Sequence, residues 1–388
     1  MNRLLQYSYP FAFLVYFVAN SALCSISHSP LSLGVGYVLL ALDILTLFYC
    51  IINKKNKSHI PIYILIGLIY YTLSSFLNNP FGKSFFSIGC AVWLISPIFF
   101  IMGSYLQSDK VKLSTIYYGI IISLFASVPG IMNSFSDIGK QDSSAYFFSY
   151  SVLPFILVYY IHLFYSQKTK ISYCLIFVSV LLIIASSKRG ALLALFPLII
   201  CVVLFEYHVR IKKLIPLIVF AIIIMYVVSR IMPDQIQFIL DRFAEDDSES
   251  FGSGRSYIWS LVLFDYTNSD ILGYLFGKGV YSSYQVTGAA LEKDYSAHST
   301  YIGLLHDYGI IGLLCYLSII CGMISKSIKA IKKHYKYAYI MLSLVLTLIV
   351  IGITEYLFEF YMWFIALYFF WYFTRDFESN INIKEFNK

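Results

Sequence analysis

The chain has 388 residues, of which 59% are hydrophobic and only 13% are charged, with a net charge of +7. A soluble domain carries about 25% charged residues, so this composition excludes a water-soluble globular protein and indicates one polytopic membrane domain over 1–388. The positive charge does not indicate nucleic-acid binding, because most basic residues lie in short loops between apolar spans, where they set orientation.

A helix needs about 20 mostly apolar residues to cross a bilayer. Twelve segments are predicted to do so, which makes the protein all-α: 8–25, 31–52, 59–78, 84–107, 113–133, 146–166, 171–187, 190–207, 214–231, 300–325, 337–355 and 358–374. The first segment resembles a signal peptide in its charge pattern, but a retained span fits the orientation better. The seventh and eighth could form one long helix. A tight turn with Gly190 is favoured, because Lys188 and Arg189 at mid-bilayer would each cost about 3 kcal/mol.

The basic residues define the orientation of these spans. About 19 of the 28 Lys and Arg residues fall in one set of alternating loops, and the remaining 9 or so fall in the other. Both termini are therefore predicted to be cytoplasmic, and the long polar loop at 232–299 is predicted to be outside. Losing or gaining one span would disrupt this alternation.

The loop at 232–299 is the only long polar interruption in the chain. Its acidic run at 241–249 matches no cation-binding loop and is interpreted as a solvated face. An amphipathic helix lying on the membrane is predicted from Arg255 to Phe264. Glycines at 273, 277 and 279 predict turns, and Ser299 or Thr300 is a plausible N-cap. Gly309 either ends a short surface helix or lies within one continuous helix.

The seven cysteines show no spacing typical of disulfides or metal sites and are interpreted as small apolar residues. They are Cys24, Cys50, Cys90, Cys174, Cys201, Cys315 and Cys321.

Three residues on the outer face could carry chemistry: Arg189, Arg255 and His298. Arginine binds phosphate through a planar fork of donors, and histidine can act as a base near neutral pH. Together they suit a reaction on a lipid-linked phosphate or diphosphate. Each also has a structural alternative: Arg189 as an interface anchor, Arg255 as a solvated loop charge, and His298 as a capping residue.

Acidic and aromatic residues add weaker candidates. Asp43 lies within the second span, where a carboxylate is often functional but can also bond a neighbouring hydroxyl. Glu355 and Glu359, near the outer turn between the last two spans, could line the same cavity or face water. Tyr257 and Tyr301 flank the Arg and His motifs, and aromatic rings near the loop could stack on sugars.

Three local patterns on this topology resemble the O-antigen ligase and polymerase superfamily. They are Ser-Lys-Arg-Gly-Ala-Leu-Leu at 187–193, Gly-Arg-Ser-Tyr-Ile-Trp at 254–259, and His298 followed by Gly309 and Gly312. The family usually has Asn after the His, where this chain has Ser299. The resemblance covers roughly 170–325.

This resemblance implies a GT-C-type membrane glycosyltransferase that needs no metal or other cofactor and uses an undecaprenyl-diphosphate-linked donor. Arg189 and Arg255 would hold the diphosphate, and His298 would activate the acceptor hydroxyl. Lys188, Tyr257, Tyr301 and Glu355, which the resemblance does not assign, are predicted as further substrate contacts. The enzyme would lie in a bacterial inner membrane with its site facing the periplasm, and a chain-length-regulating membrane protein could be its partner.

A polymerase, which extends a lipid-linked repeat unit, is favoured over a ligase, which transfers the glycan to lipid A-core. A transporter or flippase of lipid-linked sugars is the alternative from another class, and it would predict broken spans in paired halves. A structural scaffold would leave Arg189, Arg255 and His298 dispensable.

Overall fold

The computed structural model describes residues 66, 67, 69–71, 73, 74, 174, 180, 189–200, 226, 230, 255–291, 295–357, 370, 371 and 373–378. Over these residues the protein is helical and has no strand, in agreement with the predicted all-α class. Most of the twelve predicted spans lie outside the described residues, as do Asp43, Lys188, Glu359 and the acidic run at 241–249.

Helix α14 (Thr300–Lys332) is the one helix in the described part that is long and apolar enough to cross a membrane. It kinks at Gly309, whose backbone angles (φ 68°, ψ −173°) belong to a region that only glycine adopts readily. Of the two alternatives for Gly309, the first is therefore confirmed: a short helix at 300–308 precedes the longer segment at 310–332. That segment is about 34 Å long at 1.5 Å per residue, enough for a hydrocarbon core of roughly 30 Å.

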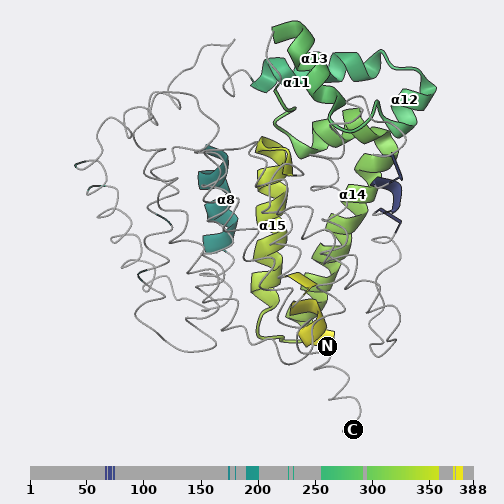
Figure 1. Cartoon of the computed structure of the whole chain (residues 1–388). Coiled ribbons are helices and arrows are strands. Elements are labelled where there is room, and N and C mark those ends of the chain that lie inside the picture. The colour runs from purple at the N-terminus through teal and green to yellow at the C-terminus, as the bar shows by residue number, and fades with distance from the viewer. Residues whose placement is uncertain are drawn as a thin grey trace, which may run out of the picture.

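Helix α15 (Ala338–Thr354) packs along α14 on one side and along α8 (Arg189–Ile200) on the other (Figure 1). Ala191 and Ala194 of α8 are completely buried, and small residues of this kind let two helices approach closely. Gly190, predicted to form a turn, lies inside α8 instead. A turn after Lys332 reverses the chain, so the C-terminal end of α15 returns to the start of α14.

Three short helices from the polar loop, α11 (Arg255–Thr267), α12 (Ile271–Phe276) and α13 (Ser282–Leu291), cover the N-terminal end of α14 (Figure 1). The predicted helix from Arg255 is confirmed as α11. Its apolar residues Ile258 and Val262 do not face a membrane, however. They pack against Ala297 in a small buried cluster that Leu291 and Tyr295 help to close. The end of the loop folds back onto α11, which a pattern of apolar spacing does not reveal.

Candidate functional site

Glu355 joins two of the predicted site residues. Its Oε1 accepts a hydrogen bond from Nη2 of Arg255 at 2.8 Å, and its Oε2 lies 3.7 Å from Nδ1 of His298. The Glu355 side chain is 1% exposed, whereas those of Arg255 and His298 are each 20% exposed. The first residue of α11, the residue before the α14 N-cap and the residue after α15 therefore meet around one buried carboxylate.

The backbone at Glu355 fixes the carboxylate in place. The Glu355 amide donates to the carbonyl of Ile351, and this is the last hydrogen bond of α15. Its carbonyl accepts hydrogen bonds from both the amide (3.0 Å) and the hydroxyl (2.8 Å) of Thr300, the first residue of α14. The Thr300 hydroxyl in turn accepts from the amide of Leu357 at 2.8 Å. A carboxylate this deeply buried requires charged and hydrogen-bonded partners. The hydrogen bonds between the end of α15 and the start of α14 hold Glu355 where Arg255 and His298 can be those partners.

His298 has a left-handed backbone conformation, with φ of 46°. Such a conformation is uncommon for a residue with a side chain and is often found at functional sites. The Ser296 hydroxyl accepts from the His298 amide at 3.3 Å and lies 3.5 Å from its Nδ1. The next residue, Ser299, is the N-cap of α14 as predicted, but its side chain makes no capping hydrogen bond. The turn holds His298 directly before the N-terminal end of α14.

Three other predicted site residues, Arg189, Tyr257 and Tyr301, lie in the described part of the chain. Arg189 starts α8, which packs along the helix that leads to Glu355. Tyr257 is exposed on α11. The Tyr301 hydroxyl donates to the carbonyl of Ile349 at 3.2 Å, so this side chain links α14 to α15. That contact favours a structural role for Tyr301.

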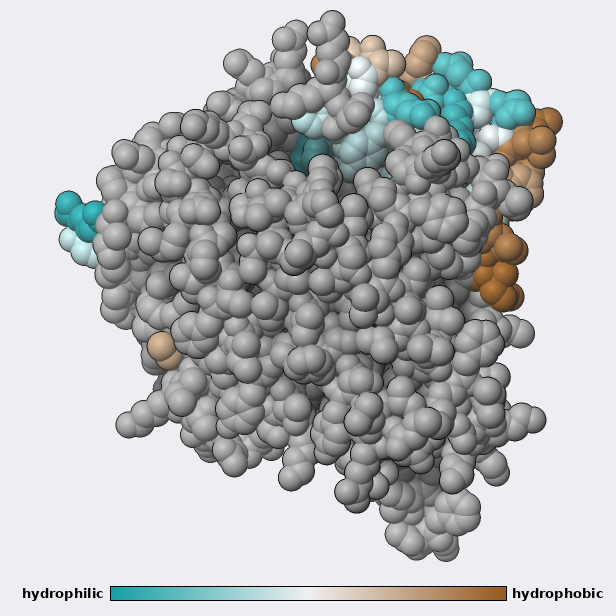
Figure 2. Space-filling model, in the orientation of Figure 1, coloured by the Kyte–Doolittle hydropathy of each residue, from teal (hydrophilic) through white to brown (hydrophobic). Residues whose placement is uncertain are grey.

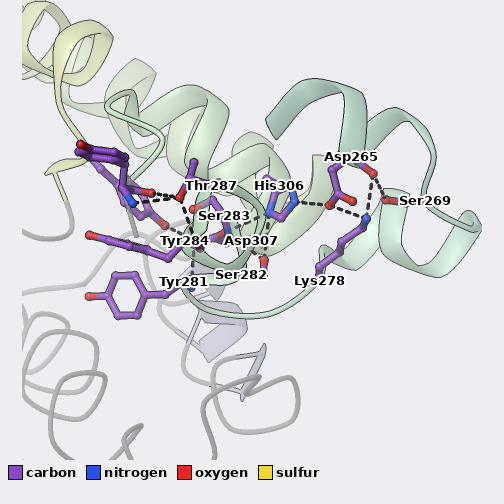
Figure 3. A network of polar contacts seen from close by, with 12 residues as sticks. Asp265, Ser269, Lys278, Tyr281, Ser282, Ser283, Tyr284, Thr287, His306 and Asp307 are labelled. Atoms are coloured by element: carbon purple, nitrogen blue, oxygen red, sulfur yellow. Dashed lines mark hydrogen bonds and ion pairs between the residues drawn. The ribbon is translucent and has the colours of Figure 1, made fainter. Parts of the chain in front are cut away.

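A second polar cluster, which the sequence did not predict, is built around His306 and Asp307 of α14 (Figure 3). Asp307 is completely buried and accepts hydrogen bonds from the amides of Tyr281 and Ser283, each at 3.0 Å. It also accepts from the hydroxyls of Ser282 (3.1 Å) and Tyr356 (3.0 Å). Asp307 thereby fixes α13 to α14 and to the residue that follows Glu355.

His306 extends this cluster to α11. Its Nε2 lies 2.8 Å from Oδ2 of Asp265, and the same oxygen accepts from Nζ of Lys278 at 2.6 Å. Burial alone would raise the pKa of Asp265, but the hydrogen bonds and charges of Lys278 and His306 outweigh burial and lower it. The order Ser282, His306, Asp265 is similar to that of a nucleophile, base and acid. Ser282 is nevertheless buried and also donates to Asp307, so the cluster is structural.

The predicted Gly-Lys-Gly turn at 277–279 also attaches the polar loop to α14. Gly277 (φ 80°) and Gly279 (φ 109°) both lie in the left-handed region, and the amides of Lys278 and Gly279 donate to the carbonyls of His306 and Asp307 at 3.0 Å. A Cβ at Gly277 would lie 2.4 Å from the backbone of Asp307. Glycine is therefore required for the loop to lie directly on α14. The adjacent His306 and Asp307 within an apolar helix were the signal that could have located this cluster.

Within the described residues, no group of three or more His, Cys, Asp or Glu side chains is arranged to hold a metal ion. The described cysteines Cys174, Cys315 and Cys321 are free thiols.

The family model of the O-antigen ligases matches residues 174–317. This interval contains Arg189, Arg255 and His298, whereas Glu355 lies beyond its end. No curated protein matches the chain. The match agrees with the segment at roughly 170–325 on which the sequence resemblance was based. Over residues 174–317 the chain is therefore similar to the O-antigen ligases, which supports the resemblance to the ligase and polymerase superfamily.

Proposed function

We propose that this protein is a membrane glycosyltransferase that moves a glycan from an undecaprenyl-diphosphate-linked donor to an acceptor at the periplasmic face of a bacterial inner membrane. The family match over 174–317 supports the reaction class. The observation that carries the site assignment is the convergence of Arg255 and His298 on Glu355, from positions 100 and 57 residues away in the chain. Two residues selected by separate motifs share one buried partner.

In the proposed reaction, an acceptor hydroxyl attacks the anomeric carbon of the donor sugar, and His298 takes the hydroxyl proton. The bond between that carbon and the diphosphate oxygen breaks, and its electron pair stays on the leaving diphosphate. Arg255, together with Arg189, stabilises the negative charge that develops there. Attack from the face opposite the leaving group inverts the anomeric centre.

For Glu355 we propose a positioning role in place of the substrate contact predicted from the sequence. Because its carboxylate is buried and holds Arg255, we assign it as a positioning residue. Its Oε2 faces Nδ1 of His298 at 3.7 Å, so Nε2 is the atom left to accept the acceptor proton. When His298 is protonated, a carboxylate beside Nδ1 stabilises the imidazolium, as carboxylates do beside catalytic histidines in other enzymes.

Polymerase is the preferred activity and ligase is the alternative, since the site chemistry is common to both. The test is the envelope glycan ladder of a host that lacks the gene and is complemented with wild type or His298→Ala. A single repeat unit on the lipid core in the deletion strain identifies a polymerase. Bare core with long chains accumulating on the lipid carrier identifies a ligase.

His298→Ala should reproduce the deletion phenotype while the protein still inserts into the membrane at normal levels. A ladder of normal length in that variant would contradict the assignment of His298 as base. A ladder that does not change in the deletion strain would favour a transporter instead.

A further inference from the structure

Helix α12 is an apolar helix with no buried side chain. It consists of Ile-Leu-Gly-Tyr-Leu-Phe, and all five of its large side chains are exposed. Ile271 and Leu272 are 78% and 64% exposed, and Phe264 at the end of α11 is also exposed. Contiguous apolar surface of this kind on a folded element usually marks a site of contact with a partner or a membrane.

The exposure of α12 is a fixed feature, because both ends of the helix are anchored. The Asp270 carboxylate caps its start by accepting from the amide of Gly273 at 2.8 Å. The Tyr274 ring stacks on Tyr266 with 4.7 Å between centroids. At the other end, the helix backbone lies against the kink of α14, where a Cβ on Gly309 would be 2.3 Å from the carbonyl oxygen of Leu275. The apolar side chains therefore cannot turn inward without breaking these contacts.

Helix α12 lies next to the apolar surface of the membrane-spanning helices. It contacts α14 at Gly309, where the segment long enough to span a membrane begins. The Tyr70 hydroxyl donates to the carbonyl of Tyr308 at 2.7 Å and lies 3.4 Å from that of Phe276. The helical residues around Tyr70 present an outward stripe with helical spacing: Ile66, Ile69 and Leu73, all at least half exposed.

Below the kink α14 also exposes large apolar side chains, namely Ile310, Leu314 and Leu317. In Figure 2 apolar atoms gather on the right-hand edge of the molecule, at the place of α12 in Figure 1 and again below it on the same edge. An outward stripe of large apolar side chains beside a membrane-spanning segment is the surface that lipid tails cover.

We propose that α12 is inserted into the outer leaflet of the bilayer, at the boundary between lipid head groups and acyl chains. The uncharged helix is bounded by Asp270 and Lys278, which suits an element whose ends reach water while its body lies in lipid. Tyrosine and phenylalanine are suited to this depth. Because α12 is fixed to Gly309 and, through Gly277, to Asp307, its insertion sets the height of the whole loop above the membrane. The proposal does not depend on which glycosyl transfer the protein carries out.

The test is photo-crosslinking of the full-length protein in its native membrane. A benzophenone amino acid is placed at Leu272, and a second variant carries it at Gln285, an exposed residue of α13 in the same loop. After irradiation the protein is purified, and adducts are identified by intact-mass spectrometry. We expect phospholipid adducts at position 272 at several times the level found at 285.

Three other results would overturn the proposal. A covalent dimer at position 272 would assign α12 to contact with a second copy, and an adduct with another protein would assign it to a partner. Equal lipid labelling at 272 and 285 would show that α12 lies outside the bilayer. Normal expression and an unchanged elution profile in detergent show that the substituted proteins are folded.

A second measurement uses protein purified into vesicles of phosphatidylethanolamine and phosphatidylglycerol. Tryptophan replaces Leu272 or, in the control, Gln285, and the increase in fluorescence quenching over wild type is measured with brominated lipids and with aqueous acrylamide. Leu272→Trp should respond mainly to the brominated lipids and Gln285→Trp mainly to acrylamide. Quenching of Leu272→Trp by acrylamide as strong as that of Gln285→Trp would contradict lipid insertion.

Discussion

Replacing Glu355 with Gln tests the proposed site directly. The substitution keeps the shape of the side chain and one oxygen acceptor for Arg255, but it removes the charge that Arg255 and His298 share. Removing one member of a buried ion pair costs about 3–5 kcal/mol. Because Gln still accepts a hydrogen bond and Arg255 is partly exposed, we expect a smaller loss of stability, about 1–3 kcal/mol.

The effect on activity should be larger than the effect on folding. Without the carboxylate, Arg255 loses the contact that orients its guanidinium, and His298 loses the charge beside Nδ1. Misplacing a catalytic group by about 1 Å can cost on the order of 100-fold in rate. We therefore expect glycan transfer by Glu355→Gln to fall about 100-fold, which corresponds to about 2.7 kcal/mol in the activation barrier.

The assay measures the initial rate of glycan transfer in vesicles that contain purified protein and lipid-linked donor and acceptor. The matched control is Glu378→Gln, which removes the carboxylate paired with Lys326 of α14, away from the site. The control should keep the wild-type rate, and Glu355→Asp should recover part of the activity that Glu355→Gln loses. A wild-type rate in Glu355→Gln, with the protein correctly folded, would refute the positioning role of Glu355.

The other predictions concern the arginines, the kink and the buried carboxylate. Arg255→Lys and Arg189→Lys should each retain only part of the transfer rate, because lysine lacks the bidentate fork; full activity in both would indicate a general charge effect. Gly309→Ala should lower stability by about 3 kcal/mol, from a glycine-only backbone conformation and a 2.3 Å contact. Thermal unfolding in detergent measures this loss, and Gly352→Ala, whose nearest contact is 3.4 Å, should cost much less. Asp307→Asn should loosen the loop by about 3 kcal/mol, because four donors lose a charged acceptor, and limited proteolysis within 255–299 should become faster; an unchanged digestion rate would contradict this.

Local sequence patterns were sufficient for features that depend on neighbouring residues. The apolar run with Gly309 predicted α14 and offered a break at the correct position, and the glycines at 277 and 279 predicted the turn that the structure shows. The start of α11 at Arg255 followed from apolar residues at helical spacing. These features are determined by backbone conformations and side-chain periods within about one or two helical turns, and a single sequence records them.

Tertiary structure alone decided which residues meet. Glu355 was one of several acidic candidates until the reversal between α14 and α15 placed it beside His298 and Arg255. His306 and Asp307 belong to no recognisable motif in the sequence, although they fix the loop to α14. The apolar face of α11 also points away from the predicted direction, because Ile258 and Val262 pack against Ala297, more than 30 residues away in the chain. Burial of charge and pairing across long separations depend on how helices pack, and the free energy of that packing is not recorded in any local pattern.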